Sequence, residues 1–172
     1  NQPGIMGSSI LDGKTTMLVH VFAMVQALFP QWFEEKKKIE IEKLDEGEVP
    51  TILIAEDSKF FRNQVKGYMT EVGYNVIEAE DGIEGWNKLV EHGDDISMLV
   101  ADIEMPNMNG FELTQKIRSD RKHSKLPIIA LTTLASAEDV AKGKAVGVDE
   151  YHIKLDKERL MVSVHEYIKK TH

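Results

Sequence analysis

The chain has 172 residues, of which 42% are hydrophobic and 29% charged, a composition typical of a soluble globular protein with room for one well-packed domain. The formal net charge is −8 and no basic stripe runs through the sequence, which argues against a nucleic-acid partner. There is no cysteine, so disulfides, thiolate metal sites and cysteine nucleophiles are excluded, which fits a cytoplasmic protein.

The first 33 residues have a pattern of their own. The chain opens on Asn1 rather than Met, so we expect a piece of a longer protein. Residues 7–21 resemble a β-hairpin. Residues 17–33 are rich in apolar side chains, but polar residues and Pro30 interrupt them, and the run falls short of the roughly 20 apolar residues of a membrane-spanning helix. We therefore predict no membrane span, and we expect this apolar surface to pack on the rest of the chain or to drive a homodimer.

Residues 34–49 separate this segment from the C-terminal part of the chain. They are highly charged and contain few large apolar side chains, and Gly47 and Pro50 mark their end. Such a stretch is typical of a solvated helix or a linker. The predicted parts of the chain are an N-terminal remnant of another domain at 1–33, a charged linker or helix at 34–49 and a complete domain at 50–172.

The third part alternates short apolar β runs with helical stretches. Its first helix carries Phe61, Val65, Met69 and Val72 on one face. The predicted strands are 51–55, 75–78, 97–102, 127–131 and 150–154. The predicted helices are 58–72, 81–92, 109–120, 136–146 and 156–170. Five β–α units predict an α/β fold, a doubly wound five-stranded parallel sheet with the flavodoxin-like order 2-1-3-4-5 and helices on both faces.

Polar side chains stand where four of these strands end. Glu56 and Asp57 follow the first strand, Asp102 ends the third, Thr132 follows the fourth and Lys154 ends the fifth. In this strand order the four ends are neighbours, so we expect these side chains to converge on one pocket. Each alone has a simpler interpretation, such as a helix cap or a surface charge, but their joint position at the strand ends favours a functional site.

Three carboxylates in one pocket repel each other, so a proton or a cation must offset them. Oxygen ligands favour a hard cation, Mg²⁺ or Mn²⁺ in its place. We expect Asp57, Asp102 and the backbone carbonyl of Glu104 to bind Mg²⁺ directly, and Glu56 to act through a bound water.

An aspartate beside Mg²⁺ is also a usable nucleophile towards a phosphoryl group. Asp102 would accept the group, Lys154 and Mg²⁺ would offset the charge on its oxygens, and the hydroxyl of Thr132 would donate to one of them. The sequence therefore predicts phosphoryl chemistry at the carboxyl ends of the strands.

At these residues the sequence resembles the CheY-like receiver domains of response regulators, and the resemblance covers residues 50–172. The most specific motif is Asp-x-x-Met-Pro-x-Met-x-Gly, which begins at Asp102. The other matching stretches are 52–58, 127–132 and 147–154. The resemblance implies that Glu56 and Asp57 bind Mg²⁺, that Asp102 is the phosphoacceptor, and that Thr132 and Tyr151 form a conformational switch.

The resemblance also implies partners. A phosphohistidine kinase domain would donate the phosphoryl group, and a downstream protein would bind the face made by the fourth helix, fifth strand and fifth helix. The switch would be a shift between two existing conformers.

Several positions depart from the family pattern. Leu155 stands where Pro usually follows the lysine, so we predict a trans bond between Lys154 and Leu155. Thr133 stands where the family prefers a small residue, and Glu104 and Leu134 occupy positions that tune dephosphorylation. These departures keep open a pseudo-receiver that acts as a scaffold or a dimerisation module without phosphorylation.

A second resemblance concerns residues 7–21, which are similar to the last strands of the CheW-like domain in CheA-type chemotaxis histidine kinases. It implies a hybrid kinase with a receiver at its C-terminus as the parent protein. An enzyme of the haloacid-dehalogenase type is the remaining alternative, but that class needs a second Asp two residues after the nucleophile, where this chain has Glu104.

Overall fold

A computed structural model describes residues 5–11, 14–19, 49–133, 136–154 and 156–171. The chain divides into two compact units, Asn1–Glu40 and Ile41–His172. The division falls inside the predicted linker at 34–49, most of which lies outside the described residues. The predicted domain bounds therefore stay predictions, as do the packing and dimerisation expected of the apolar run at 17–33.

The N-terminal unit contains a β-hairpin. Strands β1 (Ile5–Leu11) and β2 (Lys14–Val19) pair in antiparallel register, with Leu11 opposite Lys14 and Ile10 opposite Thr15. The hairpin predicted from residues 7–21 is thus confirmed over the part of that range that the structure describes, 7–11 and 14–19.

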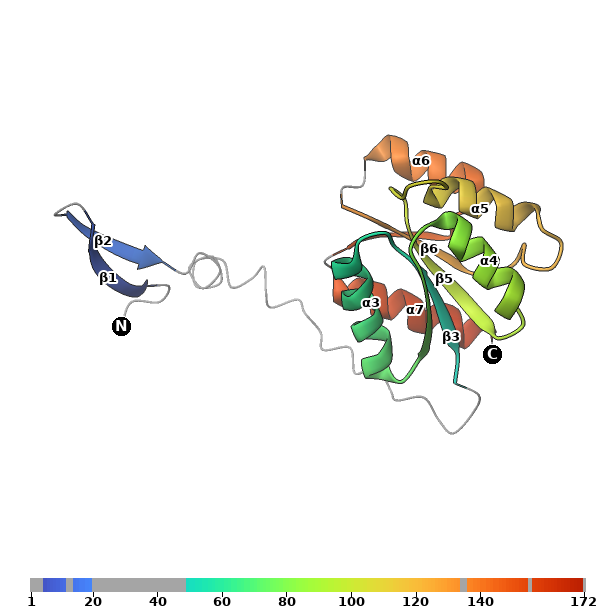
Figure 1. The fold of residues 1–172 in the computed structure, drawn as a ribbon, viewed down its shortest axis with the longest axis horizontal. Coiled ribbons are helices and arrows are strands. Elements are labelled where there is room, and N and C mark those ends of the chain that lie inside the picture. The colour runs from blue at the N-terminus through green and yellow to red at the C-terminus, as the bar shows by residue number, and fades with distance from the viewer. Residues whose placement is uncertain (1–4, 12–13, 20–48, 134–135, 155, 172) are drawn as a thin grey trace. The chain divides into compact units, whose positions relative to one another are not determined.

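The second unit is built on a five-stranded parallel sheet of order β4-β3-β5-β6-β7 (Figure 1). Counted within this unit, the order is 2-1-3-4-5, as the sequence predicts. The strands are β3 (Thr51–Ala55), β4 (Asn75–Ala79), β5 (Ile96–Asp102), β6 (Ile128–Thr132) and β7 (Glu150–Ile153).

One helix follows each strand of this sheet. The helices are α3 (Lys59–Val72), α4 (Gly82–His92), α5 (Gly110–Ser119), α6 (Ala137–Val146) and α7 (Lys157–Thr171). Side-chain caps set several starts: Asp81 accepts from the amide of Glu84, and Asn109 and Glu112 form a capping box. α6 ends at Gly147, whose φ of 100° is left-handed. Among the described residues, no helix is long and apolar enough to cross a membrane.

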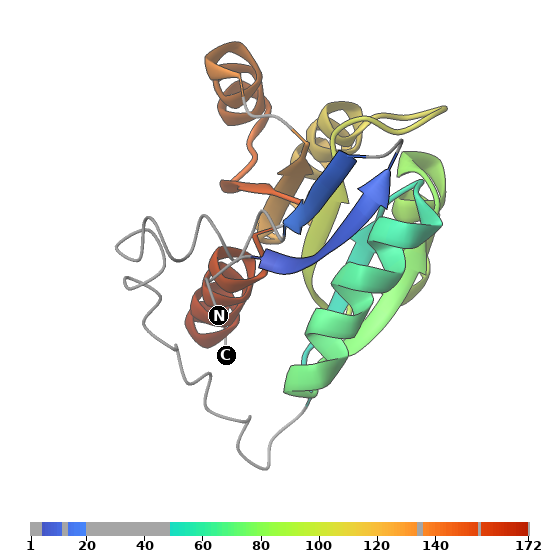
Figure 2. The ribbon, with the colours of Figure 1, turned by 90° about the vertical axis from the view of Figure 1, so that its left-hand side faces the viewer.

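The helices cover both faces of the sheet (Figures 1 and 2). Ile52 and Ile54 of β3 point to the face that α3 and α7 cover, where they pack with Val65 and Val164. Their neighbour Leu53 points to the opposite face, against α4 and α5. Because both faces are buried there, the three central strands β3, β5 and β6 are nearly continuous apolar runs, and the polar residues at their ends stand out.

Candidate functional site

Two neighbouring strands bring the acidic residues together. Ala55 lies in register with Ala101, so Glu56, one residue beyond the end of β3, stands beside Asp102 at the end of β5. Ligand oxygens of Glu56, Asp57 and Asp102 all lie within 4.8 Å of one another. Glu56 and Asp102 are 0% and 2% exposed, whereas Asp57 is exposed and leaves the group open to solvent.

Lys154, one residue beyond the end of β7, reaches into this group. Its Nζ donates to Asp102 Oδ2 at 2.8 Å and lies 3.1 Å and 3.0 Å from the two carboxylate oxygens of Glu56. Lys154 is only 6% exposed, so the ion pairs are shielded from water. Burying charges is costly unless each one is paired, and the group holds three carboxylates against one ammonium, which contacts Glu56 and Asp102. The excess charge is negative.

The protonation of two groups reflects this balance. Burial raises the pKa of Glu56 to about 7, and the negative charge of Asp102 adds to the rise. Burial alone would lower the pKa of Lys154, but its hydrogen bonds to Asp102 and Glu56 outweigh that effect and leave this pKa above its usual value. Lys154 is therefore firmly charged, while Glu56 can hold a proton near neutral pH.

The three carboxylates fit a divalent cation. Their donors are all oxygen, which is what Mg²⁺ prefers. Glu56 Oε2 is buried and accepts no hydrogen bond among the described residues, although Lys154 Nζ is near it. A second cation at the exposed side, near Asp57, would offset the excess negative charge that Lys154 leaves.

The loop between β5 and α5, which carries Glu104, is held in a defined shape. Asn107 has a left-handed φ of 65°, and its side chain donates to Asp81 Oδ2 at 2.6 Å. Gly110 lets α5 begin against the carbonyl of Asp102, because a Cβ there would collide with that oxygen. The side chain of Glu104 is exposed, and its amide donates to Asp102 Oδ1 at 3.2 Å. The loop thus presents one backbone donor to the buried carboxylate.

Arg62 is a site residue that the sequence reasoning missed. It is 7% exposed and donates to the carbonyls of Glu56 at 2.6 Å and Asp57 at 3.3 Å. On its other side it pairs with Glu80 at 2.9 Å. The guanidinium therefore fixes the backbone of the loop that presents the two acids. One signal was available: Arg62 stands three positions before the buried Val65, on the inward face of the helix.

Comparison with known proteins identifies this arrangement. The sequence matches the model of the response regulator receiver domain over residues 52–165. The chain belongs to this family. A chemotaxis protein CheY homologue of Campylobacter jejuni is 36% identical over 104 residues, which cover 60% of this chain and 79% of that protein. The solved structure of the chemotaxis protein CheY4 of Vibrio cholerae matches with a TM-score of 0.65 at 30% identity, covering 69% of this chain and 98% of that one.

A longer relative extends the similarity to the N-terminal unit. The chemotaxis protein CheV3 of Helicobacter pylori is 26% identical over an alignment that covers 99% of this chain and 57% of that protein.

The family match and the CheY homologues together show what residues 52–165 are. They form a phosphorelay receiver of two-component signalling, homologous to CheY chemotaxis response regulators.

The two predicted switch residues, Thr132 and Tyr151, belong to β6 and β7. Thr132 is buried at the end of β6, one residue beyond Leu131, which is in register with Asp102. Tyr151 is half-buried, and its hydroxyl donates to the carbonyl of Asp139 in α6 at 2.9 Å. Its ring rests against Gly143, where a Cβ would collide with it.

The departures from the family pattern are only partly visible. Thr133 is exposed after β6, whereas Leu134 and Leu155 lie outside the described residues. The predicted trans bond after Lys154 therefore stays a prediction.

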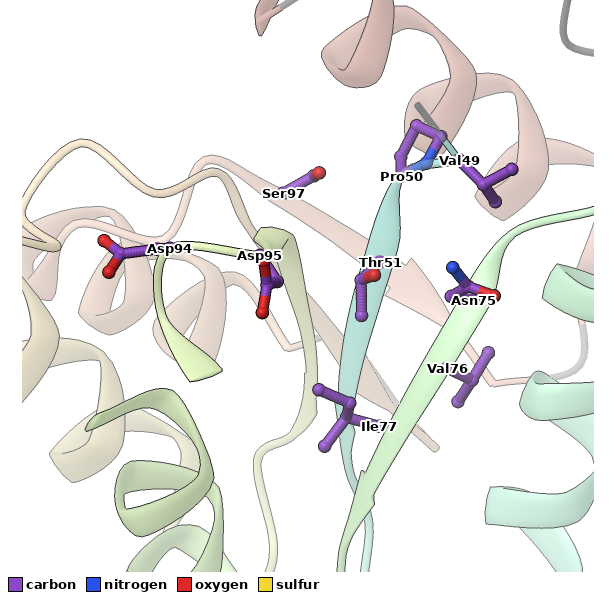
Figure 3. A pocket seen from close by; sticks show the side chains of 9 residues that line it. All are labelled: Val49, Pro50, Thr51, Asn75, Val76, Ile77, Asp94, Asp95 and Ser97. Atoms are coloured by element: carbon purple, nitrogen blue, oxygen red, sulfur yellow. The ribbon is translucent and has the colours of Figure 1, made fainter. Parts of the chain in front are cut away.

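The receiver also has an open hollow of about 600 Å³ at the opposite, amino ends of its strands (Figure 3). Asp94, Asp95, Ser97 and Asn75 are among its lining residues. None of the residues predicted for the site lines it. The candidate site is therefore distinguished by its buried charged side chains and not by the size of a hollow.

Proposed function

We propose that Asp102 accepts a phosphoryl group from a phosphohistidine of a donor kinase. The observation that supports this most directly is the buried Asp102 carboxylate, paired with Lys154 at 2.8 Å, beside two further carboxylates that leave room for a cation. A structural ion pair alone would not need Glu56 and Asp57 in the same group, because they add repulsion.

In the proposed reaction one carboxylate oxygen of Asp102 forms a bond to phosphorus, and the bond between phosphorus and the donor imidazole nitrogen breaks. The electron pair of that bond stays with the imidazole. Lys154 offsets the charge on the phosphoryl oxygens, and the hydroxyl of Thr132 donates to one of them. Asp57, Asp102 and the carbonyl of Glu104 would hold Mg²⁺, with Glu56 acting through a water. When bound, Mg²⁺ offsets negative charge on the phosphoryl oxygens.

The proposed output is a shift between two conformers. Thr132 would follow the phosphoryl group, and Tyr151 would move in response. A downstream protein would then bind the face formed by α6, β7 and α7. The contact between Tyr151 and α6 supports this, since it joins a residue of β7 to the first helix of that face.

For the parent protein we propose a chemotaxis protein of the cytoplasm with a CheW-like domain before the receiver, of which β1 and β2 are the last strands. The similarity to CheV3 supports this because it spans the N-terminal unit as well. A CheA-type hybrid kinase stays the specific prediction for the parent, and a homodimer through residues 1–33 stays a prediction.

The test is intact mass spectrometry after incubation with acetyl phosphate and Mg²⁺. We expect the chain to gain one phosphoryl group, and we expect Asp102→Asn, or removal of Mg²⁺ with EDTA, to abolish the gain. Asp94→Asn is the matched control, because Asp94 is an acidic residue at the other end of the sheet, and it should be phosphorylated like the unmodified chain.

The opposite result is equally informative. A chain that binds Mg²⁺ in a titration but gains no phosphoryl group would contradict the proposal and favour a pseudo-receiver. A gain that survives in Asp102→Asn would move the phosphoacceptor to another residue.

A further inference from the structure

The ammonium group of Lys154 has an aromatic neighbour in addition to its carboxylate partners. Its Nζ lies 4.8 Å from the centre of the Phe61 ring. A cation within about 6 Å of an aromatic centroid is attracted to the negative face of the ring. Because Lys154 is 6% exposed, little water competes, and the attraction is stronger than at an open surface.

Phe61 itself lies outside the apolar core. Within the described residues, the three apolar clusters of the receiver do not include it, whereas Val65 and Met69 of the same helix belong to one of them. The sequence predicted Phe61 on the inward face of the helix, yet its ring faces Lys154. A second ring orients it: Phe60, which is 68% exposed, meets Phe61 edge to face, with centroids 5.3 Å apart and planes at 75°.

We propose that Phe61 is a positioning residue, whose ring holds the ammonium group of Lys154 over the phosphoacceptor. This inference rests on the proposed function of Asp102. During transfer, Asp102 changes from a carboxylate to an acyl phosphate, so its contact with Lys154 changes. The attraction between ring and ammonium does not depend on the charge of Asp102, so it is present before and after transfer.

The first turn of α3 then has two tasks. Arg62 fixes the backbone of the acidic loop, and its neighbour Phe61 fixes the lysine that faces the same acids. A single helical turn thereby sets the distance between the carboxylates and their counter-charge.

The experiment replaces Phe61, in the full chain, with phenylalanine analogues that carry one, two or three ring fluorines. Fluorine weakens the negative face of the ring with little change in its size. With acetyl phosphate and Mg²⁺, we expect the logarithm of the phosphorylation rate to fall steadily with each fluorine, reaching about a tenfold loss at three. Phe61→Trp should keep the rate and Phe61→Leu should lower it, because only the former retains an aromatic face.

The matched control is the same fluorine series at Phe111, a half-buried phenylalanine of α5 that packs in the core beside Ile103. Its rate should stay level, which separates the ring's electrostatics from a general effect of fluorine. Circular dichroism of each variant verifies the fold.

The outcomes are distinguishable. Equal rates across the Phe61 series, in a chain that is phosphorylated on Asp102, would overturn this inference and leave the proposed function standing. An unmodified chain that is not phosphorylated would overturn the proposed function, and this inference with it.

Discussion

At each end of the receiver sheet, one arginine donates hydrogen bonds to the backbone carbonyls of the neighbouring loops. At the carboxyl ends of the strands, Arg62 donates to the carbonyls of Glu56 and Asp57 and pairs with Glu80. At the amino ends, Arg118 of α5 donates to the carbonyls of Gly147, Ser124 and Leu126 and pairs with Asp149.

The two ends nevertheless differ in what the arginine holds. The loop fixed by Arg62 carries Glu56, which pairs with Lys154 away from water, and the exposed Asp57, which belongs to the same acidic group. The loops fixed by Arg118 carry two acids, and each has a partner: Asp149 pairs with the arginine itself, and Asp120 lies 2.6 Å from His123 Nδ1. An arginine bound to loop carbonyls therefore stabilises the fold at one end and, by our proposal, supports chemistry at the other. What distinguishes the second end is buried negative charge that is not fully balanced.

The largest expected effect is that of removing Lys154, the counter-charge to the buried acids, on the rate of phosphorylation. In Lys154→Met the phosphoryl oxygens lose a positioned counter-charge, so we expect the rate of phosphorylation by acetyl phosphate to fall by about 10²-fold or more. Rapid-quench mass spectrometry measures it. Lys142→Met, at an exposed lysine of α6, is the control and should react at the normal rate. A Lys154→Met rate within a factor of two of the unmodified chain would contradict the role given to this lysine.

Replacing the two arginines sharpens the comparison directly. Arg62→Met and Arg118→Met should each lower the free energy of unfolding by about 1–3 kcal/mol, because each leaves buried or partly buried carbonyls without this donor. Only Arg62→Met should also weaken Mg²⁺ binding, by about tenfold, since residues that orient metal ligands affect affinity on that scale. Urea unfolding and a Mg²⁺ titration measure the two effects. Equal Mg²⁺ affinity in both variants would show that Arg62 only stabilises the fold.

The arginines also show what the sequence could and could not predict. The strands and helices were predictable to within one or two residues, because apolar runs buried on both sides end abruptly at polar or glycine residues. The convergence of Glu56, Asp57, Asp102 and Lys154 followed from strand order alone. Arg62 escaped because a charged residue in a helix is normally exposed, and only its carbonyl partners in the folded chain explain its burial.

The contacts between side chains of distant segments were likewise not predictable. Phe61 belongs by spacing to the apolar face of its helix, yet its position next to Lys154 depends on a strand that ends about ninety residues later. Gly143 has no Cβ and so leaves room for the ring of Tyr151, and this contact likewise depends on how α6 lies against β7. Pattern fixes which face a residue occupies, but the partner on that face is set by tertiary packing.

His152, a buried histidine two residues before Lys154, gives a smaller, pH-dependent effect on the free energy of unfolding. Burial lowers the pKa of His152, whose Nε2 lies 2.8 Å from Ser163 Oγ, while the charges of Glu150 and Asp156 oppose the shift. Since the unfolded chain takes up this proton first, the contribution of His152 to stability is present above its unfolded pKa of about 6.5 and is lost as the pH falls below it.

We therefore expect the free energy of unfolding to drop between pH 7.5 and pH 5.5 by more in the unmodified chain than in His152→Gln, which has no proton to gain. Urea unfolding at the two pH values measures this difference. Parallel pH profiles for the two chains would contradict it.

The smallest effect on stability and on phosphorylation is expected for the ion pair between Lys122 and Asp94, which has almost the same length as that between Lys154 and Asp102. Lys122 and Asp94 lie 2.7 Å apart at the amino end, against 2.8 Å for Lys154 and Asp102, but their side chains are 54% and 84% exposed. Water and salt screen such a pair, and holding two long side chains together costs entropy, so its net contribution is small. We expect Lys122→Met to leave both the thermal midpoint and the phosphorylation rate unchanged. A clear loss of either would mean that distance, rather than burial, decides what an ion pair contributes in this receiver.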